Sequence, residues 1–417
     1  MAFAPHEDVP ARLTPLTEAL AAIRSQLSLI VKTETLPLAQ ARGRILAADI
    51  VAGVNLPHSN NSAVDGYAMQ AADLLAESPV TLRLIGQAAA GHPFAGVVGT
   101  GEAIRILTGA PMPEGADIIV MQERCKANGV TVDVIPHPGG KTNYRSRGED
   151  IALGKLALAA GRRLRTTDLT LAAALGCRSM LVFKRLQVGL FSTGDELCEP
   201  GIPLRKGQIW DANRPLLRGL LEQMGCDVHD LGILRDDPDD LEGRLSAAAH
   251  EADLLVTSGG MSVGGEDHIR SIIRRRGTLD VWRIALRPGK PMGIGDIDAC
   301  PILALPGNPV AAAVAFTVVG RIVIEILSGA TEEPPICFTV PAAFSLEKKN
   351  KGMRQYLLGR LGHAPGGGTI AVAHEKQGSA MLSTFAASSG FIMIAEDCER
   401  IEPGDLVTFL PLDGLCG

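Results

Sequence analysis

The feature that most constrains the fold is an alternation of strand-like and helix-like segments that begins near residue 186. Short apolar runs such as "LQVGLF", "DLLVT" and "PILAL" indicate buried strands, and the segments between them carry the 3.6-residue periodicity of amphipathic helices. Strands that alternate with helices in this way build a parallel sheet with helices on both faces. The sequence therefore predicts an α/β domain over residues 185–331.

The loops that follow four of these strands are rich in glycine, serine, proline and acids. Their sequences are "STGDEL" (192–197), "RDDPDD" (235–240), "SGGMSVGGEDH" (258–268) and "PGNPV" (306–310). Because ligands of open parallel sheets bind outside the carboxyl ends of the strands, we expect these loops to meet at one edge. Backbone N–H groups and hydroxyls beside glycines suit a phosphate or another oxyanion. The loops lack G-K-[ST] and do not fit G-x-G-x-x-G, which disfavours an ATPase or a nicotinamide enzyme.

Some residues in these loops also have an ordinary structural explanation. Asp237 can cap the helix that begins at Pro238, Asp195 can cap the turn after its strand, and Pro306 and Pro309 flank a helix start. The acids that are harder to explain in this way are Glu196, Asp236, Glu266 and Asp267. Since bare carboxylates repel a phosphate, these acids favour a divalent cation as the mediator.

The rest of the chain separates into three further parts. Residues 57–148 are rich in glycine and proline and contain short strand-like runs, which predicts a β-rich domain. Residues 1–56 and 149–184 are assigned to an N-terminal linker and helical domain, with a helix expected in 13–30. Residues 332–417 follow "EEPP" and predict a small C-terminal β-barrel or sandwich. The expected fold class is therefore α/β plus β, with several domains.

The first half of the chain holds a second group of polar positions. Asp65 lies in the turn "NNSAVDGYAM", Thr108 ends a strand in "RILTGAPMPEGADIIVMQE", and Asp150 lies in "RSRGEDIALG". Each motif alone is compatible with ordinary turn chemistry. Together with the loops of the sheet, they favour a functional site.

Composition and charge exclude several classes of function. The net charge of −6 argues against general nucleic-acid binding, and the basic run Arg274–Arg276 fits a solvated helix face. The eight cysteines form no C-x-x-C motif, which indicates reduced thiols in a cytoplasmic protein. The N-terminus does not resemble a signal peptide, and Val310–Gly320 is shorter than the ~20 residues that span a bilayer. We therefore expect neither a nucleic-acid partner nor a membrane partner.

Ten motifs in order resemble one family. They are "NSAVDGYAM", "RILTGAPMPEGADIIVMQE", "RGEDIALG", "STGDEL", "GQIWDANRPLLRGLLEQMG", "LRDDPDDL", "TSGGMSVGGEDH", "LRPGKPMGIG", "LPGNPVAA" and "QGSAMLSTFAASSGFI". They run from about residue 57 to 394 and resemble the MoeA-like molybdopterin molybdenumtransferases, which include the E-domain of gephyrin. Each motif alone is weakly specific, whereas their common order is highly specific.

The resemblance implies an elongated homodimer of four-domain subunits with a MogA-like α/β domain. Its catalytic cleft would lie between the α/β domain of one subunit and the N-terminal domains of the other. The implied reaction inserts molybdate into adenylylated molybdopterin and hydrolyses the adenylyl bond, with Mg²⁺, to give AMP and molybdenum cofactor. The implied further partners are the adenylyltransferase and molybdoenzyme apoproteins.

The resemblance also implies roles for individual residues. The catalytic positions are Asp65, Thr108, Asp150, Glu196, Asp236 and Asp267. The molybdopterin- or phosphate-binding positions are Ser192, Thr193, Gly194, Gly259, Gly260, Ser262, Pro306, Gly307, Pro309 and Ser379. The molybdate-binding positions are Arg283, Arg287 and Lys290, and the metal-binding positions are Asp267 and Glu196.

Three positions depart from the pattern of the family. Arg283 and Arg287 replace lysines, and Leu358 stands where a basic residue is usual, with Arg354 or Arg360 as candidates to replace its charge. One alternative is therefore a catalytically impaired paralogue that binds molybdopterin as a scaffold. Another is a nucleotide-sugar or phosphate-binding enzyme of unrelated chemistry. The retained acids favour the transferase.

Overall fold

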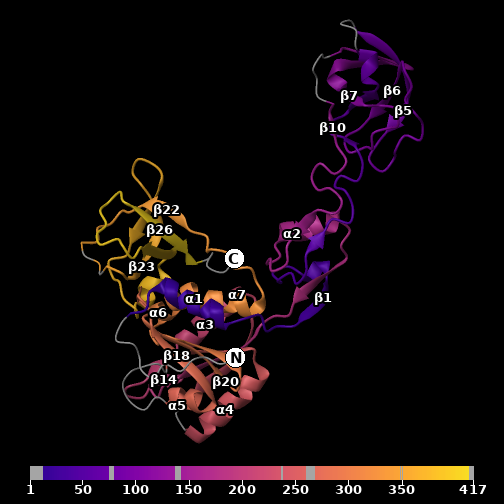
Figure 1. The fold of residues 1–417 in the computed structure, drawn as a ribbon. Coiled ribbons are helices and arrows are strands. Elements are labelled where there is room, and N and C mark those ends of the chain that lie inside the picture. Colours follow the sequence, from indigo (N-terminus) through magenta and orange to yellow (C-terminus); the bar gives the residue numbers. More distant parts are fainter. Residues whose placement is uncertain are drawn as a thin grey trace.

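The chain folds into an elongated molecule with two bodies (Figure 1). In this computed structural model, the described residues are 13–74, 79–136, 142–235, 238–259, 268–347, 349 and 351–412. One body contains the α/β domain and the C-terminal β domain. A smaller module with α2 and β1 leads away from it to the β-rich domain at the far end.

The α/β domain is built on a six-stranded sheet with the order β16-β13-β17-β21-β20-β18. Its strands are β13 (Gln187–Thr193), β16 (Asp227–Leu234), β17 (Leu254–Ser258), β18 (Gly277–Arg283), β20 (Pro291–Ile297) and β21 (Cys300–Leu305). Its helices are α3 (Asn213–Gln223), α4 (Pro238–Glu251), α5 (His268–Arg276), α6 (Pro309–Ala315) and α7 (Arg321–Ser328), with the π-helical turn η4 (Phe316–Gly320) between the last two. These elements confirm the predicted alternation. Val188 faces a core with α3 and α6, and Phe191 faces one with α4 and α5, so helices cover both faces of the sheet.

The prediction of a parallel sheet is wrong at one edge. The strands β13, β16, β17 and β21 are parallel, whereas β20 is antiparallel to both β21 and β18. The cause is a tight hairpin between β20 and β21, in which Asp298 (φ 49°) and Ala299 (φ 68°) both have left-handed backbone angles. A two-residue turn of this kind joins antiparallel strands. The pair Asp298-Ala299 is not one of the Asn-Gly or Asp-Gly pairs from which such a turn is predicted in a sequence.

One helical run, Pro309–Ser328, is long and apolar enough to cross a membrane, and 94% of its most apolar window is buried inside the protein. Its two charged residues, Arg321 and Glu325, are also buried, and they neutralise each other. Arg321 Nη1 donates to Glu325 Oε1, one turn later, at 2.5 Å. The run is therefore the central helix of the core.

The N-terminal helix α1 (Leu16–Gln26) packs against this same core through Leu16, Ala19 and Ile23. We expected this helix in the linker domain, but its apolar face is buried beside the α/β sheet. The linker module itself pairs β1 with β12 and β2 with β11. Its elements are β1 (Thr33–Pro37), η1 (Leu38–Gln40), β2 (Ile50–Val51), β11 (Leu156–Leu158), α2 (Thr166–Ala174) and β12 (Ser179–Phe183).

The distal domain is β-rich, as predicted. Its six-stranded sheet has the order β7-β4-β6-β5-β9-β8, and β3 pairs with β10. The elements are β3 (Asn61–Ser62), β4 (Gly66–Met69), η2 (Ala71–Leu74), β5 (Val80–Ala88), β6 (Glu102–Ile106), β7 (Ile118–Met121), η3 (Gln122–Arg124), β8 (Cys125–Asn128), β9 (Thr131–Val134) and β10 (Tyr144–Arg145).

The C-terminal domain is also built from strands. Its sheet has the order β19-β23-β25-β26-β22, with β24 paired to β23. A bridge joins Ala342, the residue after β22, to Ala371 in the middle of β24. The elements are β19 (Leu286–Arg287), β22 (Phe338–Pro341), β23 (Arg354–His363), β24 (Thr369–Ala373), α8 (Leu382–Ala386), β25 (Gly390–Ile394) and β26 (Leu406–Pro411). Since β19 comes from the α/β segment, the two domains share this sheet.

Candidate functional site

The carboxyl ends of three parallel strands meet closely, as the sequence predicts. The Gly259 N–H donates to Leu305 O at 3.1 Å. Gly259 has a φ of +92°, and a Cβ on it would lie 3.3 Å from Thr193 O. A Cβ on Gly307 would lie 3.6 Å from the Gly259 Cα. The backbones of the three loops therefore pack against one another with little side-chain volume between them.

Asn213, the first residue of α3, connects two of these loops. Its Nδ2 donates to Ser258 Oγ at 2.7 Å and to Gly307 O at 2.6 Å. Its Oδ1 and the Oγ of Ser192 are buried without a hydrogen-bond partner among the described residues. Buried polar atoms in this state are rare and call for an explanation such as a ligand or a water molecule. Asn213 lies in the motif "GQIWDANRPLLRGLLEQMG", but it was not among the predicted site residues.

Glu196 lies in the loop after β13 with an exposed side chain. Its carboxylate lies over the preceding glycine, because a Cβ on Gly194 would fall 2.4 Å from Glu196 Oε2. Gly194 has a φ of +140°, which an L-residue rarely adopts. The loop is tied down by the Ile209 N–H, which donates to Glu196 O at 2.7 Å. The turn thus holds the carboxylate beside the ends of the strands.

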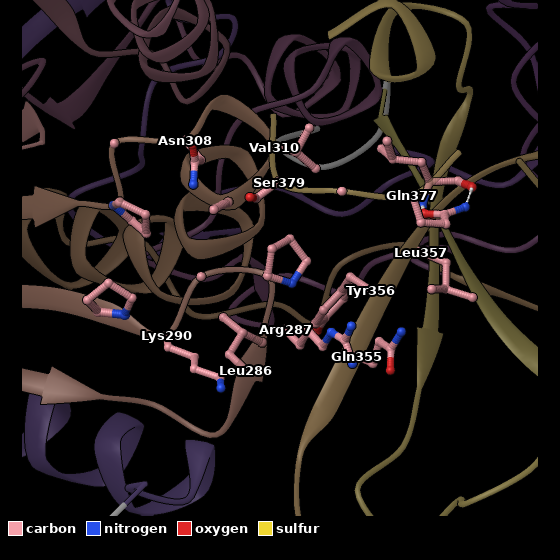
Figure 2. A pocket seen from close by; sticks show the side chains of 18 residues that line it. Leu286, Arg287, Lys290, Asn308, Val310, Gln355, Tyr356, Leu357, Gln377 and Ser379 are labelled. Atoms are coloured by element: carbon pink, nitrogen blue, oxygen red, sulfur yellow. Dashed lines mark hydrogen bonds between the residues drawn. The ribbon is translucent and has the colours of Figure 1, made fainter. Parts of the chain in front are cut away.

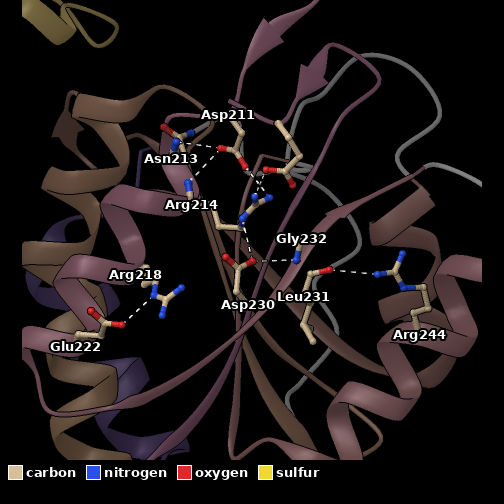
Figure 3. Close-up of polar contacts among 10 residues, drawn as sticks. Asp211, Asn213, Arg214, Arg218, Glu222, Asp230, Leu231, Gly232 and Arg244 are labelled. Atoms are coloured by element: carbon tan, nitrogen blue, oxygen red, sulfur yellow. Dashed lines mark hydrogen bonds and ion pairs between the residues drawn. The ribbon is translucent and has the colours of Figure 1, made fainter. Parts of the chain in front are cut away.

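A buried arginine fixes the segment between Glu196 and α3 (Figure 3). The Arg214 guanidinium contacts Glu199 at 2.5 Å, Asp230 at 2.9 Å and Asp211 at 3.2 Å. Burial acts against the charge of Arg214, but the bond to Glu199 and the charges of Asp230 and Asp211 outweigh it, so its pKa is raised. Asp211 also accepts from the backbone N–H of Asn213 at 3.0 Å. This network links the loop that carries Glu196 to the start of α3.

A cavity of about 510 Å³ lies where the α/β domain meets the C-terminal domain (Figure 2). Its walls are Leu286, Arg287, Pro288, Gly289, Lys290, Pro291, Pro306, Gly307, Asn308, Val310, Ala311, Gln355, Tyr356, Leu357, Leu358, Gln377, Gly378 and Ser379. Arg287 and Lys290 lie on one side, and Ser379 lies across from them with Asn308 and Val310. Two of the lining residues are cationic and none is acidic, so the cavity favours an anion.

The cavity wall includes Leu358, where the resemblance led us to expect a basic residue. Arg354 does not take over that role in this cavity, because it pairs with Glu396 at 2.9 Å and lines a different cavity. Neither Arg360 nor Arg283 is among the lining residues. Of the three expected molybdate-binding residues, the structure brings Arg287 and Lys290 to the cavity.

In the distal domain, Asp65 and Thr108 are directly bonded. The backbone N–H and the hydroxyl of Thr108 both donate to Asp65 Oδ1, at 2.8 and 2.7 Å. These two bonds, the backbone bond first, lower the pKa of Asp65 below its usual value. The pairing of β4 with β6 places the two residues together, because Gly66 lies opposite Ile106. A Cβ on Gly66 would fall 2.1 Å from Val120 O of β7, so the pairing of β4 with β7 on its other side requires a glycine here.

The two groups of site residues lie far apart within one chain. The strands β6 and β7 are at the opposite end of the molecule from α4 and α5 (Figure 1). Asp150 is exposed near the base of the distal domain, where its N–H donates to Leu56 O at 3.1 Å. Six singled-out residues lie outside the described part of the chain: Asp236, Asp237, Gly260, Ser262, Glu266 and Asp267.

The expected metal pair, Glu196 and Asp267, is only half described. Within the described ranges, no group of three or more His, Cys, Asp or Glu side chains is arranged to hold a metal ion. Magnesium, however, is usually held by one or two carboxylates together with substrate phosphates and water, not by a full protein cage. The Glu196 carboxylate is exposed and lies beside the loops at the strand ends that are expected to bind a phosphate. It therefore fits that mode of binding.

Three family models match consecutive parts of the chain. The MoeA N-terminal region (domain I and II) matches residues 14–176, a probable molybdopterin binding domain matches 189–325, and the MoeA C-terminal region (domain IV) matches 339–412. The chain is 37% identical to the molybdopterin molybdenumtransferase of Haemophilus influenzae over 413 residues, which cover 96% of this chain and 99% of that protein. It is 33% identical to molybdopterin molybdenumtransferase 2 of Mycobacterium tuberculosis, over 89% of this chain and 93% of that protein.

A solved structure has a similar fold over nearly the full length. It is the molybdopterin biosynthesis moeA protein of Pyrococcus horikoshii OT3, with a TM-score of 0.82 and 29% sequence identity. The match covers 96% of this chain and 100% of that chain.

Proposed function

Since the chain belongs to the MoeA family and is a molybdopterin molybdenumtransferase of molybdenum cofactor biosynthesis, we propose that it inserts molybdate into adenylylated molybdopterin with hydrolysis of the adenylyl bond. The products of this reaction are AMP and molybdenum cofactor. The cytoplasm, where cysteines stay reduced, is the proposed compartment.

The cavity between the α/β and C-terminal domains is the observation that carries the proposal. Arg287 and Lys290 supply two positive charges without an acid among the lining residues, and Ser379 adds a hydroxyl. Molybdate is a tetrahedral dianion, and such a site would hold it by charge and hydrogen bonds. Pro306 and Gly307 line the same cavity, and Gly307 also adjoins Gly259. This continuity supports delivery of molybdate to a substrate bound at the ends of the strands.

The loops at the strand ends are proposed to bind the phosphate-containing part of the substrate. Ser192, Thr193, Gly194, Gly259 and Gly307 supply backbone groups, hydroxyls and close access, and Gly260, Ser262 and Pro309 are proposed to complete the pocket. Glu196, with Asp267, would hold Mg²⁺ against the substrate phosphates. When bound, the ion would polarise the phosphoanhydride. Asp236 is proposed to act beside them on the attacking water, and Arg283 to add charge from outside the cavity.

A second copy of the chain is proposed to complete the site. Asp65, Thr108 and Asp150 lie in or beside the distal domain, far from Glu196 in the same chain (Figure 1). A homodimer in which the distal domain of one subunit covers the strand ends of the other would bring the two groups together. Adenylyltransferase and molybdoenzyme apoproteins are the proposed further partners.

The test is release of AMP from adenylylated molybdopterin by the purified protein with Mg²⁺, with and without molybdate. Molybdate-dependent release is the expected result. Tight binding without release at any molybdate concentration would contradict the transferase and favour a scaffold, with Leu358 as the first residue to revert. Absence of binding would favour unrelated phosphate chemistry.

A further inference from the structure

The segment that carries Ser379 is held by the side chain of Gln377. Gln377 Oε1 accepts from the Leu358 N–H at 2.8 Å, and its Nε2 donates to Leu358 O at 2.8 Å. The same Nε2 donates to His374 O at 2.8 Å. The amide therefore pairs with both backbone groups of Leu358, as a residue of a neighbouring strand would (Figure 2).

This bonding begins where the backbone ladder between β23 and β24 ends. Regular pairing stops at Gly359 and Ala373, and the His374 N–H adds one more bond to Leu358 O at 3.0 Å. Beyond this point the chain leaves the sheet, and the Gln377 side chain takes the place of a backbone partner. Gln377 thus attaches residues 374–379 to the buried strand β23.

The far end of the same segment is attached to the α/β domain. The Val310 N–H, in the first turn of α6, donates to Ser379 O at 3.0 Å. Ser379 is therefore fixed from two sides, by Gln377 through β23 and by Val310 through α6. Together these contacts set the distance between Ser379 and the opposite wall, where Arg287 and Lys290 lie.

Gln377 has no hydrogen-bond donor left with which to bind a ligand. A glutamine amide has two N–H donors, and both are used on backbone carbonyls. Its remaining lone pair would repel an anion in the cavity. We infer that Gln377 is a positioning residue, which places Ser379 in the anion cavity without itself binding the anion.

The test begins with ligand-free protein, so that it does not depend on the proposed function. Gln377→Met keeps the length of the side chain and removes all three hydrogen bonds. Hydrogen exchange of the Val310 and Leu358 amides is expected to become about tenfold faster, while the amides of β25 keep their wild-type rates. Unchanged exchange at Val310 would overturn the inference. Glu375→Gln, an exposed change in the same segment outside the cavity wall, is the control and should alter neither amide.

A second measurement asks whether Gln377 acts through Ser379 and rests on the proposed function. Tungstate, a tetrahedral dianion like molybdate, is titrated calorimetrically into wild type, Gln377→Met, Ser379→Ala and the double variant. Each single variant is expected to bind about tenfold more weakly, and the double variant no more weakly than Ser379→Ala. Additive losses would overturn an action through Ser379. If wild type does not bind tungstate, the anion cavity is refuted, and hydrogen exchange alone decides the role of Gln377.

Discussion

Asp65 and Thr108 are held together by two hydrogen bonds where β4 begins and β6 ends in the distal sheet. The N–H and the hydroxyl of Thr108 both donate to the same oxygen, Asp65 Oδ1. Two donors on one carboxylate oxygen stabilise its charged form. The carboxylate is nevertheless exposed, so it can contact a group brought to it from outside the chain. This combination suits an acid that must remain ionised at a surface that a second subunit covers in the proposed homodimer.

Thr108→Val should raise the pKa of Asp65 toward its ordinary value, because the hydroxyl donor is lost while the backbone donor remains. The lowered pKa means that this contact stabilises the fold above the unfolded-state pKa of ~3.9 and loses that effect as pH falls through the folded-state pKa. An NMR titration of the Asp65 carboxyl carbon measures the shift. An identical titration midpoint in the variant would show that the hydroxyl does not matter.

Glu196→Gln should reduce turnover by about 10²-fold or more while the melting temperature stays unchanged, since the side chain is exposed and only its charge is removed. The assay is AMP release at saturating molybdate. Glu251→Gln, at the exposed C-terminal end of α4, serves as the matched control and should retain full activity. Full activity of Glu196→Gln would remove this residue from the catalytic group.

Arg287→Met should increase the molybdate concentration needed for half-maximal turnover by about tenfold, because one of two cations in the cavity is lost. Binding of the pterin substrate should change much less. The control is Arg360→Met, an exposed arginine outside the cavity wall. A molybdate titration of Arg287→Met that overlays the wild-type curve would exclude this arginine as an anion ligand.

Alkylation with iodoacetamide at pH 8 should modify Cys337 well before Cys125 and Cys300. Cys337 is exposed, whereas burial raises the pKa of Cys125 to about 11 and that of Cys300 to about 12. At pH 8 the latter two thiols are almost entirely protonated and therefore unreactive. Peptide mass spectrometry over time gives the order of modification. Early labelling of Cys300 would contradict the described packing of β21.

The sequence predicts elements well where local signals and tertiary packing agree. The strand expected at "PILAL" lies in β21 at Cys300–Leu305, and the helix expected to begin at Pro238 is α4. The hairpin through Asp298 and Ala299 could not be foreseen, because the aspartate is followed by an alanine, a residue with no preference for the left-handed angle that it adopts here. The placement of α1 depends on which apolar surface covers its face, which periodicity does not encode.

The candidate site was predictable in its parts but not in its connections. The glycines at the strand ends and the pair Arg287 and Lys290 carry chemical signals that spacing and resemblance reveal. Asn213 and Gln377 act through hydrogen bonds to backbone atoms that lie 94 and 19 residues away in the sequence. Nothing in the sequence around a single amide side chain indicates which distant backbone atom it will contact. The spacing of residues does not reveal that Asp65 lies far from Glu196 in one chain; only the resemblance implied it, and the elongated shape agrees (Figure 1).

The most direct test of a site shared between two copies is molybdate-dependent AMP release by mixed subunits. Asp65→Ala and Glu196→Ala proteins are each expected to be inactive alone. After unfolding, mixing in equal amounts and refolding, half of the dimers are mixed, and each mixed dimer has one site with both acids intact. If the site is shared in this way, the mixture should recover about one quarter of wild-type activity. A refolded mixture that stays as inactive as its two components, while a wild-type sample recovers under the same conditions, would contradict it.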